Sequence, residues 1–356
     1  MATSSPQRIA WKRWFAGLAV IAVLVSAAAC GDSSDDESSS GDDEQVSTSV
    51  TLYSGRSEEL VGPIIDRFSE ETGITVDVRY GDSAELALLI EEEGDRSPAD
   101  VFYSQAPGAM GYLDANDRLS ELPDSILERV PERFRADDGK WVGVTGRVRV
   151  VVYDSAVTTK ADLPKSYADL AKPEFASRLG IAPENGSFID FVSELRVVEG
   201  DEAAQKWLDA LHANGVKTYA NNTAIREAVA RGEITFGFIN HYYNARALAE
   251  DPSATTTNGF FADGDLGSLV LVTAVGIMNS AEHRDAAEKL IEFLLSDEAQ
   301  EYFATETFEY PLVEGVALAS DLPPLTDVGT PPADFEALGA DLTSTREMIR
   351  KAGFTG

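Results

Sequence analysis

Two adjacent tyrosines, Tyr242 and Tyr243, follow the apolar, strand-like run 234–240. Phenolate oxygen is a hard, anionic donor of the kind that ferric iron prefers. A free tyrosine ionises at about pH 10, but a bound metal stabilises the phenolate and releases its proton. The alternative is that both rings fill a core. If the pair continued the strand, this would need burial on both faces, because neighbouring strand residues point to opposite sides. The pair is therefore a candidate metal site that the rest of the chain has to support.

The chain begins with a segment typical of protein export. Basic residues between positions 8 and 13 precede an apolar stretch over 14–29, which ends in three alanines. This stretch is short for a membrane span and ends in small residues, as a secretory signal peptide does. We predict that residues 1–29 are a signal peptide and that the protein works outside the cytoplasm.

Cys30 is the only cysteine, which excludes an intramolecular disulfide. Its place directly behind small residues resembles a bacterial lipobox, in which the cysteine is lipidated and becomes the first residue of the mature protein. An ordinary cleaved signal followed by an incidental thiol is the alternative. Residues 30–45 are rich in serine and acids and are predicted to form a solvated linker. These features predict lipid anchoring to the cell membrane, on the surface of a Gram-positive-like bacterium.

The composition restricts the class of partner. A formal net charge of −32 at pH 7 argues against nucleic acid and anionic membrane surfaces, and it is compatible with collecting cations. The sequence contains no Gly-x-Ser-x-Gly, P-loop or paired-cysteine motif, and its three histidines offer few general bases. We predict a binding protein and not an enzyme.

From position 46 onward the chain is long enough for two domains and alternates strand and helix patterns. Strands are predicted over 49–53, 74–80 and 99–103, and helices between Ser57 and Gly73 and over 84–93. This βαβαβ order predicts a mostly parallel sheet covered by helices, with ligands at the carboxyl ends of its strands. Later helices are predicted over 203–213 and 224–231, then a strand over 234–239 and a helix from about 244.

Two long, mostly apolar segments rich in β-branched residues, 146–153 and 268–278, stand apart from this alternation. They predict either long strands shared between two lobes or central strands of a single sheet.

Six motifs lie in order along the chain: VTLYSGR at 50–56, FSEETGI at 68–74, EEGDRSPADVFY at 92–103, GRVRVVVYD at 146–154, INHYY at 239–243 and EYPL at 309–312. Together they resemble the periplasmic ferric-ion-binding proteins of ABC importers. The resemblance implies an α/β, two-lobed periplasmic-binding-protein fold of type II (a Venus flytrap) with two crossover hinge strands. The lobes would comprise 46–147 plus 275–322 and 148–274 plus 323–356. It also implies a monomer that delivers iron to an ABC permease driven by an ATPase.

Within this resemblance, the ligand tyrosines correspond to Tyr242 and Tyr243. The family's histidine ligand falls at Ser57, and its glutamate ligand falls at Gln105, whose amide oxygen is a weaker donor. A third tyrosine of the carbonate-dependent members falls at Phe188.

Glu58 stands where some subfamilies have a tyrosine ligand. Its carboxylate is a hard donor that could bind iron, but a glutamate at this place also complements the dipole of the predicted helix. The N-terminal lobe therefore offers no obvious matching ligand.

The resemblance also implies a synergistic anion, carbonate or bicarbonate or else phosphate, that fills open iron positions. Arg147 corresponds to the family's anion-contacting arginine, and Arg149 lies on the same face of the predicted strand. Residues 185–187 precede a helix-like run and could bind an anion at a helix N-terminus. The complete predicted anion set is Arg147, Arg149, Asn185, Gly186, Ser187, Asn222 and Asn240.

The expected function is an extracytoplasmic receptor that captures Fe(III) with an anion between two lobes. One alternative is a receptor of the same fold for an organic or oxyanion ligand, such as an organophosphonate or thiamine. Another is a surface sensor module without a role in transport.

Overall fold

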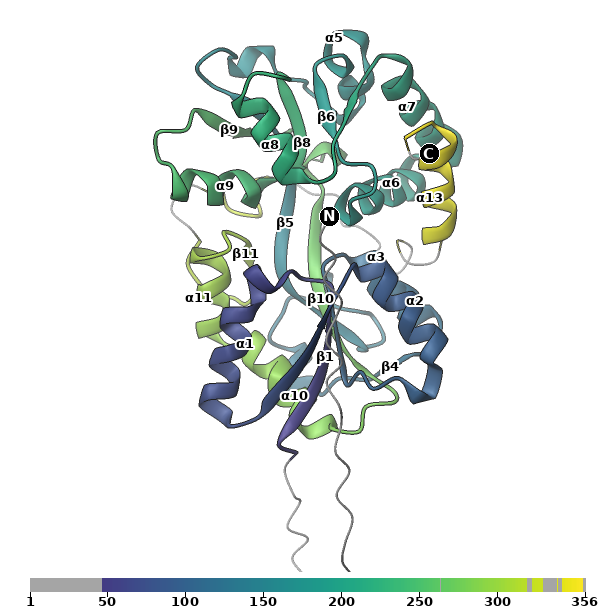
Figure 1. Cartoon of the computed structure of the whole chain (residues 1–356), viewed down its shortest axis with the longest axis vertical. Coiled ribbons are helices and arrows are strands. Elements are labelled where there is room, and N and C mark those ends of the chain that lie inside the picture. Colours follow the sequence, from purple (N-terminus) through teal and green to yellow (C-terminus); the bar gives the residue numbers. More distant parts are fainter. Residues whose placement is uncertain (1–46, 263, 319–321, 329–337, 339–340, 355–356) are drawn as a thin grey trace, which may run out of the picture. The chain divides into compact units, whose positions relative to one another are not determined.

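The computed structural model describes residues 47–354 apart from 263, 319–321, 329–337 and 339–340 (Figure 1). The described residues belong to one compact unit, Gln45–Gly356. The predicted signal peptide, Cys30 and the acidic linker lie outside the described residues, so their roles stay predictions.

The predicted βαβαβ unit is confirmed. It consists of β1 (Ser49–Ser54), α1 (Glu58–Thr72), β2 (Thr75–Tyr80), α2 (Ser83–Glu93) and β3 (Val101–Ser104). β1 pairs in parallel with both β2 and β3. Helix α1 begins after Ser57 and ends at Gly73, whose φ of 73° is the left-handed conformation that glycine adopts easily. The residues that α1 buries form one apolar face, Leu60, Val61, Ile64, Ile65 and Phe68.

Two long buried strands run through the middle of the sheet. β5 (Trp141–Asp154) and β10 (Val270–Met278) pair antiparallel, and the strand order is β2-β1-β3-β10-β5-β8-β6-β7. The early part of β5 pairs with β10 and β11, whereas its later part pairs with β8 and β9. Figure 1 shows β5 and β10 joining two groups of elements.

We call these groups the first and second lobes. The first lobe contains β1–β4, β11, α1–α4, α10 and α11, and the second contains β6–β9, α5–α9 and α13 (Figure 1). The residue boundaries predicted for the lobes stay a prediction.

The remaining elements of the first lobe are α3 (Pro107–Ala115), β4 (Leu119–Ser120), α4 (Asp124–Leu127), α10 (Arg284–Leu294), α11 (Asp297–Thr305) and β11 (Tyr310–Pro311). Those of the second lobe are α5 (Pro173–Ala176), β6 (Leu179–Ile181), α6 (Gly186–Glu199), α7 (Asp201–Ala213), β7 (Lys217–Thr218), α8 (Asn222–Ala230), β8 (Phe236–Asn240), α9 (His241–Glu250), β9 (Thr256–Gly259) and α13 (Leu342–Lys351). Across the described part of the chain, no helix is both long and apolar enough to cross a membrane.

One prediction about the tyrosine pair is wrong. The helix expected from about position 244 begins at His241, so Tyr242 and Tyr243 lie in the first turn of α9 and do not continue the strand. Their side chains therefore leave the backbone about 100° apart, as helix geometry dictates, and not on opposite faces of a sheet. The preceding residue, Asn240, has the extended backbone of a helix N-cap, with φ −82° and ψ 145°.

Candidate functional site

The two tyrosine rings stack on each other at the start of α9. Their centroids are 4.2 Å apart, with 29° between the ring planes. Tyr242 is fully buried, whereas Tyr243 is only partly buried. The Tyr242 hydroxyl has no hydrogen-bond partner among the described residues. A buried phenol without a partner is costly, so this oxygen is poised for a ligand.

Burial is the main reason why the pKa of Tyr242 lies well above its usual value. The neighbouring Tyr243 raises this pKa further. Arg56 opposes the rise, Glu309 adds to it, and Arg147 opposes it. The free protein therefore holds Tyr242 as a neutral phenol, and a cation at its oxygen is needed to make it a phenolate.

His241 fixes the first turn of α9 against the rest of the protein. Its Nδ1 accepts a hydrogen bond from the Val148 N–H at 3.1 Å, so Nε2 is the donor to the Phe308 carbonyl, 2.8 Å away. Burial lowers the pKa of His241 to about 4, which keeps the ring neutral in this tautomer. The histidine thus ties α9 to β5 and to the segment before β11.

The two predicted anion-binding arginines of β5 differ in how far they are engaged. Both are fully buried. Arg147 donates one hydrogen bond, from Nη2 to the Val272 carbonyl at 3.1 Å, while its Nε and Nη1 have no partner in the described part of the chain. Burial lowers the pKa of Arg147, and nearby Arg56 lowers it further. Arg147 therefore keeps two donors for an anion.

Arg149 is largely satisfied within the protein. Its Nη1 donates to Ser187 Oγ at 3.1 Å and to Asn240 Oδ1 at 3.2 Å, and its Nη2 donates to the Phe238 carbonyl at 2.8 Å. The guanidinium lies over the Phe238 ring, 4.1 Å from its centroid. Burial lowers its pKa to about 9, which leaves it charged at neutral pH. In this arrangement Arg149 positions its neighbours.

The predicted asparagine and serine residues form one network with Arg149. Asn185 is the N-cap of α6, and its Oδ1 accepts from the Ser187 N–H at 3.2 Å and from Ser187 Oγ at 2.6 Å. Asn222 donates from Nδ2 to the same oxygen at 3.3 Å. Asn240 accepts from Arg149, while its buried Nδ2 has no partner within the described residues. The structure thus brings together residues of β5, β8, α6 and α8 that belong to the predicted anion set, and their binding of an anion stays a prediction.

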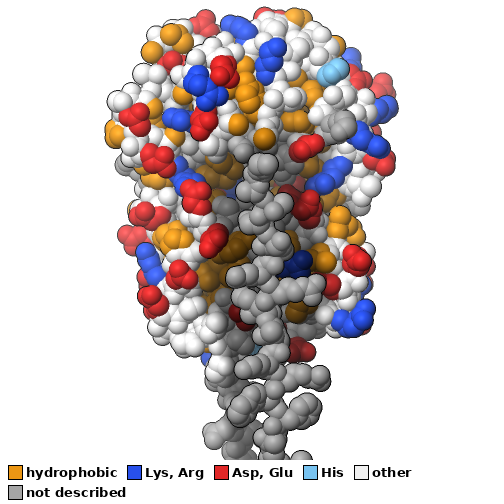
Figure 2. Space-filling view, in the orientation of Figure 1, with side chains coloured by type: hydrophobic (Ala, Val, Ile, Leu, Met, Phe, Trp, Pro, Cys, Tyr) orange, Lys and Arg blue, Asp and Glu red, His pale blue; other side chains and the backbone are white. Residues whose placement is uncertain are grey.

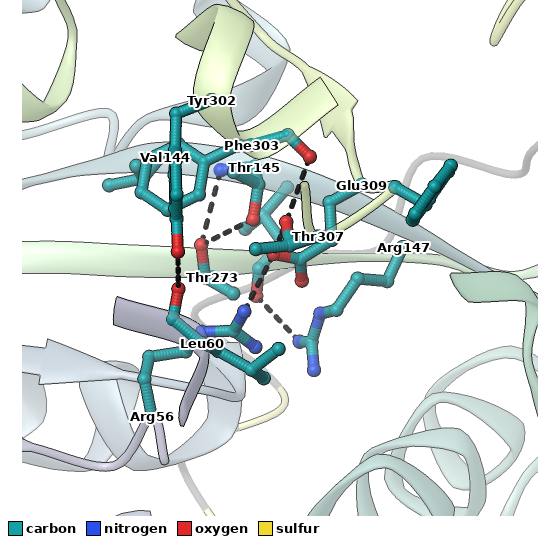
Figure 3. Close-up of polar contacts among 12 residues, drawn as sticks. Arg56, Leu60, Val144, Thr145, Arg147, Thr273, Tyr302, Phe303, Thr307 and Glu309 are labelled. Atoms are coloured by element: carbon teal, nitrogen blue, oxygen red, sulfur yellow. Dashed lines mark hydrogen bonds and ion pairs between the residues drawn. The ribbon is translucent and has the colours of Figure 1, made fainter. Parts of the chain in front are cut away.

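The sequence did not reveal a buried ion pair beside the tyrosines. Arg56 follows β1, and its Nη2 donates to Glu309 Oε2 at 2.6 Å, with both side chains fully buried (Figure 3). Thr307 Oγ1 donates to the same carboxylate oxygen at 3.0 Å. Burial has the largest effect and lowers the pKa of Arg56, but Glu309 and three nearby tyrosines together outweigh it, and the net pKa is raised. The two residues are 253 positions apart, so only their presence in two family-like motifs could have pointed to them.

A pocket of about 260 Å³ opens between residues of the two lobes. Its lining includes Arg56, Ser57 and Gln105 from the first lobe and Asn185 and Gly186 from the second. The backbone N–H of Gln105 donates to Ser83 Oγ at 2.9 Å. Of the residues predicted to bind iron, Gln105 lines this pocket. Tyr242, Tyr243 and Glu58 are not among its lining residues, and Glu58 is exposed at the start of α1.

Acidic and basic side chains are intermixed over the face shown in Figure 2. In the described part of the chain, no group of three or more His, Cys, Asp or Glu side chains could hold a metal ion.

The chain is similar to known bacterial solute-binding proteins. Residues 96–335 match the family described as bacterial extracellular solute-binding protein. The chain is 34% identical over 312 residues to the major ferric iron-binding protein of Neisseria meningitidis serogroup B, covering 85% of this chain and 92% of that one. It is 31% identical to iron uptake protein A1 of Synechocystis, over 92% of both chains.

Solved structures of iron-binding proteins are also similar to this chain. Iron-bound HitA from Pseudomonas aeruginosa has a TM-score of 0.82 at 31% identity, over 86% of this chain and 99% of that one. The Trichodesmium protein IdiA (FutA), in complex with iron and citrate ligands, has a TM-score of 0.74 at 27% identity, over 86% and 100% of the two chains.

Proposed function

This chain belongs to the bacterial extracellular solute-binding protein family, in the group that contains the ferric iron-binding proteins, and from that premise we propose that it is an extracytoplasmic receptor that captures Fe(III) for an ABC importer. Its fold is the α/β type II periplasmic-binding-protein fold, as predicted from the sequence. Members of this family are receptors and not enzymes, in agreement with the sequence analysis.

The observation that carries the proposal is the state of Tyr242. Its hydroxyl is buried without a partner, its ring is stacked on Tyr243, and the unengaged donors of Arg147 lie on the neighbouring strand. A ferric ion would deprotonate both phenols and bind their oxygens. Because Tyr242 is fully buried, iron can enter only when the lobes move apart, and closure would then seal the site.

The proposed iron site needs further donors, because two phenolates leave several positions of a six-coordinate ion open. An anion such as carbonate, bicarbonate or phosphate would fill some of them, held by Nε and Nη1 of Arg147 and by Nδ2 of Asn240. Ser187, Asn185, Gly186 and Asn222 would shape this anion site through the network around Arg149. Gln105 could add a weak oxygen from the first lobe, whereas the exposed Glu58 would need lobe movement to reach the metal.

The remaining parts of the proposal concern delivery. We infer that the receptor works as a monomer, held at the membrane by lipidated Cys30, and that it passes iron to a permease and its ATPase.

The test is a ferric titration of the purified protein, followed by visible absorption. We expect a tyrosinate-to-iron charge-transfer band that saturates when iron and protein are equimolar. The double variant Tyr242→Phe/Tyr243→Phe should lose the band. Tyr153→Phe is the matched control, because Tyr153 is a buried tyrosine at the far end of β5.

Removing bicarbonate and phosphate should weaken the band if an anion completes the site. A wild-type protein that stays colourless under every anion condition, yet binds an organophosphonate or another oxyanion, would replace the proposal with the alternative ligand class.

A further inference from the structure

Helix α6 carries a buried carboxylate that the proposed iron site does not use. Asp190 is 2% exposed and lines the pocket between the lobes. Its Oδ2 has no hydrogen-bond partner among the residues that the structure describes. A carboxylate in this state is costly to bury, so its presence requires a reason.

Asp190 faces the first turn of α3, which belongs to the other lobe. A Cβ atom added to Gly108, the second residue of α3, would lie only 2.9 Å from Asp190 Oδ1 and 3.4 Å from the Leu338 carbonyl oxygen. Real Cβ atoms essentially never approach another heavy atom within 3.0 Å. A methyl group at position 108 would therefore displace the Asp190 side chain, whereas glycine lets the two lobes approach with this carboxylate in place.

A second pair of residues shows the same approach. A Cβ atom added to Gly186, the first residue of α6, would lie 3.8 Å from the Cβ of Ala106, the N-cap of α3. The N-terminal turns of α3 and α6 therefore meet across the lobe interface. Neither is held there by covalent neighbours, because the two helices are about 80 positions apart along the chain.

Opposing electrostatic effects act on the Asp190 carboxylate at this contact. The N-terminus of α3 has no side-chain cap and no acid in its first turn, so its N–H groups and dipole favour a carboxylate nearby. Burial has the opposite effect, because a carboxylate loses its hydration. Three charged side chains also act on Asp190. Arg147 and Arg149 of β5 favour its ionised form, and Asp82, which precedes α2, disfavours it. Burial outweighs the favourable neighbours, and the pKa of Asp190 is raised to about 7.

We propose that Asp190 and Gly108 form the contact that sets how easily the two lobes close. When the lobes separate, both residues become solvated and the cost of burying the charge disappears. When the lobes close, the Asp190 carboxylate is buried against α3, and glycine at position 108 leaves room for it in its present position. The ligand must supply the free energy for this step, so an empty receptor stays open more of the time. The inference does not depend on which ligand the cleft holds, and it rests on the proposed function only for the use of iron in one assay.

The test measures closure directly, by a disulfide that forms only when the lobes meet. Ala106→Cys and Gly186→Cys place two Cβ atoms at the 3.8 Å separation that a disulfide needs. Cys30→Ser removes the only native thiol. In this background we expect Gly108→Ala to slow cross-linking by about tenfold or more, since overpacking a tight contact disfavours the closed arrangement. Adding Asp190→Ala should restore most of the rate by making room for the new methyl group.

The matched control is Gly62→Ala in the middle of α1. A Cβ atom there would meet nothing closer than 3.4 Å, and Gly62 does not line the pocket. Thermal unfolding of each variant separates a loss of closure from a loss of the fold. With the native residues at 106 and 186, ferric affinity should fall in Gly108→Ala and recover in Gly108→Ala/Asp190→Ala.

The outcomes are distinct. Cross-linking that is equally fast in Gly108→Ala and the parent, or no recovery in the double variant, would overturn the inference whatever the protein binds. A parent that shows the expected cross-linking pattern but no ferric charge-transfer band would support the inference and refute the proposed function.

Discussion

Replacing Glu309 by glutamine should destabilise the fold strongly, although glutamine has almost the same shape. Glu309 and Arg56 are both fully buried, and their ion pair is 2.6 Å long. Glutamine would keep an oxygen for Thr307, which now donates to the carboxylate at 3.0 Å. It would not balance the charge of Arg56. The variant therefore leaves a guanidinium buried without its counter-ion, while most packing contacts remain.

The size of the effect follows from this uncompensated charge. Removing one partner of a buried ion pair typically costs about 3–5 kcal/mol, because the remaining charge stays desolvated. For a domain of this length, 1 kcal/mol corresponds to roughly 2 °C in melting temperature, so we expect a fall of about 6–10 °C. Replacing both residues by apolar ones, in Arg56→Met/Glu309→Leu, should recover most of the loss, since neither buried charge remains.

Urea unfolding of the parent, Glu309→Gln and Arg56→Met/Glu309→Leu measures the free energies directly. Glu288→Gln is the matched control, because Glu288 pairs with Arg284 at 2.8 Å on the surface and should contribute less than about 1 kcal/mol. Two results would refute the reasoning. One is a Glu309→Gln protein within about 1 kcal/mol of the parent, and the other is a double variant no more stable than that single variant.

Two further predictions concern the cleft. Arg147→Gln should weaken ferric binding by about ten- to a hundredfold and reduce its dependence on bicarbonate, as loss of an outer partner of a metal site does; a binding curve and anion dependence equal to those of the parent would contradict this. Asp190→Asn should remove a pH dependence of closure. The ordinary pKa of Asp190 is 3.8 and burial raises it to about 7, so the closed form holds a proton that the open form releases between these values, and closure weakens as pH rises through this window. The ratio of cross-linking rates, Asp190→Asn over parent, should therefore increase from pH 5 to pH 8, and a constant ratio would contradict it.

Much of the fold could be predicted because its signals are local. The apolar face of α1 and its stop at Gly73 follow from residues within a few turns of each other. The tyrosine pair could also be identified from the sequence, because the residue type alone indicates that a phenol oxygen could bind a metal. Where α9 starts was not predicted correctly. Asn240 ends a buried strand and also caps a helix, and the hydrogen bonds that fix His241 come from Val148 and Phe308, far along the chain.

The residues missed by sequence analysis share one property: their partners are remote. Arg56 gains its counter-ion from a segment near the end of the chain, and Asp190 lies in an apolar run where nothing nearby indicates that it faces another helix. Spacing along the sequence carries no information about such contacts. They depend on how the two lobes meet, which is a property of the whole fold.

The buried charges also explain what the first lobe contributes if it supplies no strong iron ligand. A ferric ion bound by two phenolates keeps one positive charge, and the buried Arg147 and Arg149 add two more, one of which the Asp190 carboxylate offsets when it is ionised. Arg56 adds none to this balance, because Glu309 neutralises it within the lobe. The site is then neutral only with a doubly charged anion, such as carbonate or hydrogen phosphate, and a singly charged anion would leave an uncompensated charge in a closed cleft. In the proposed arrangement the first lobe would act by covering the site, while the anion would supply the missing donors.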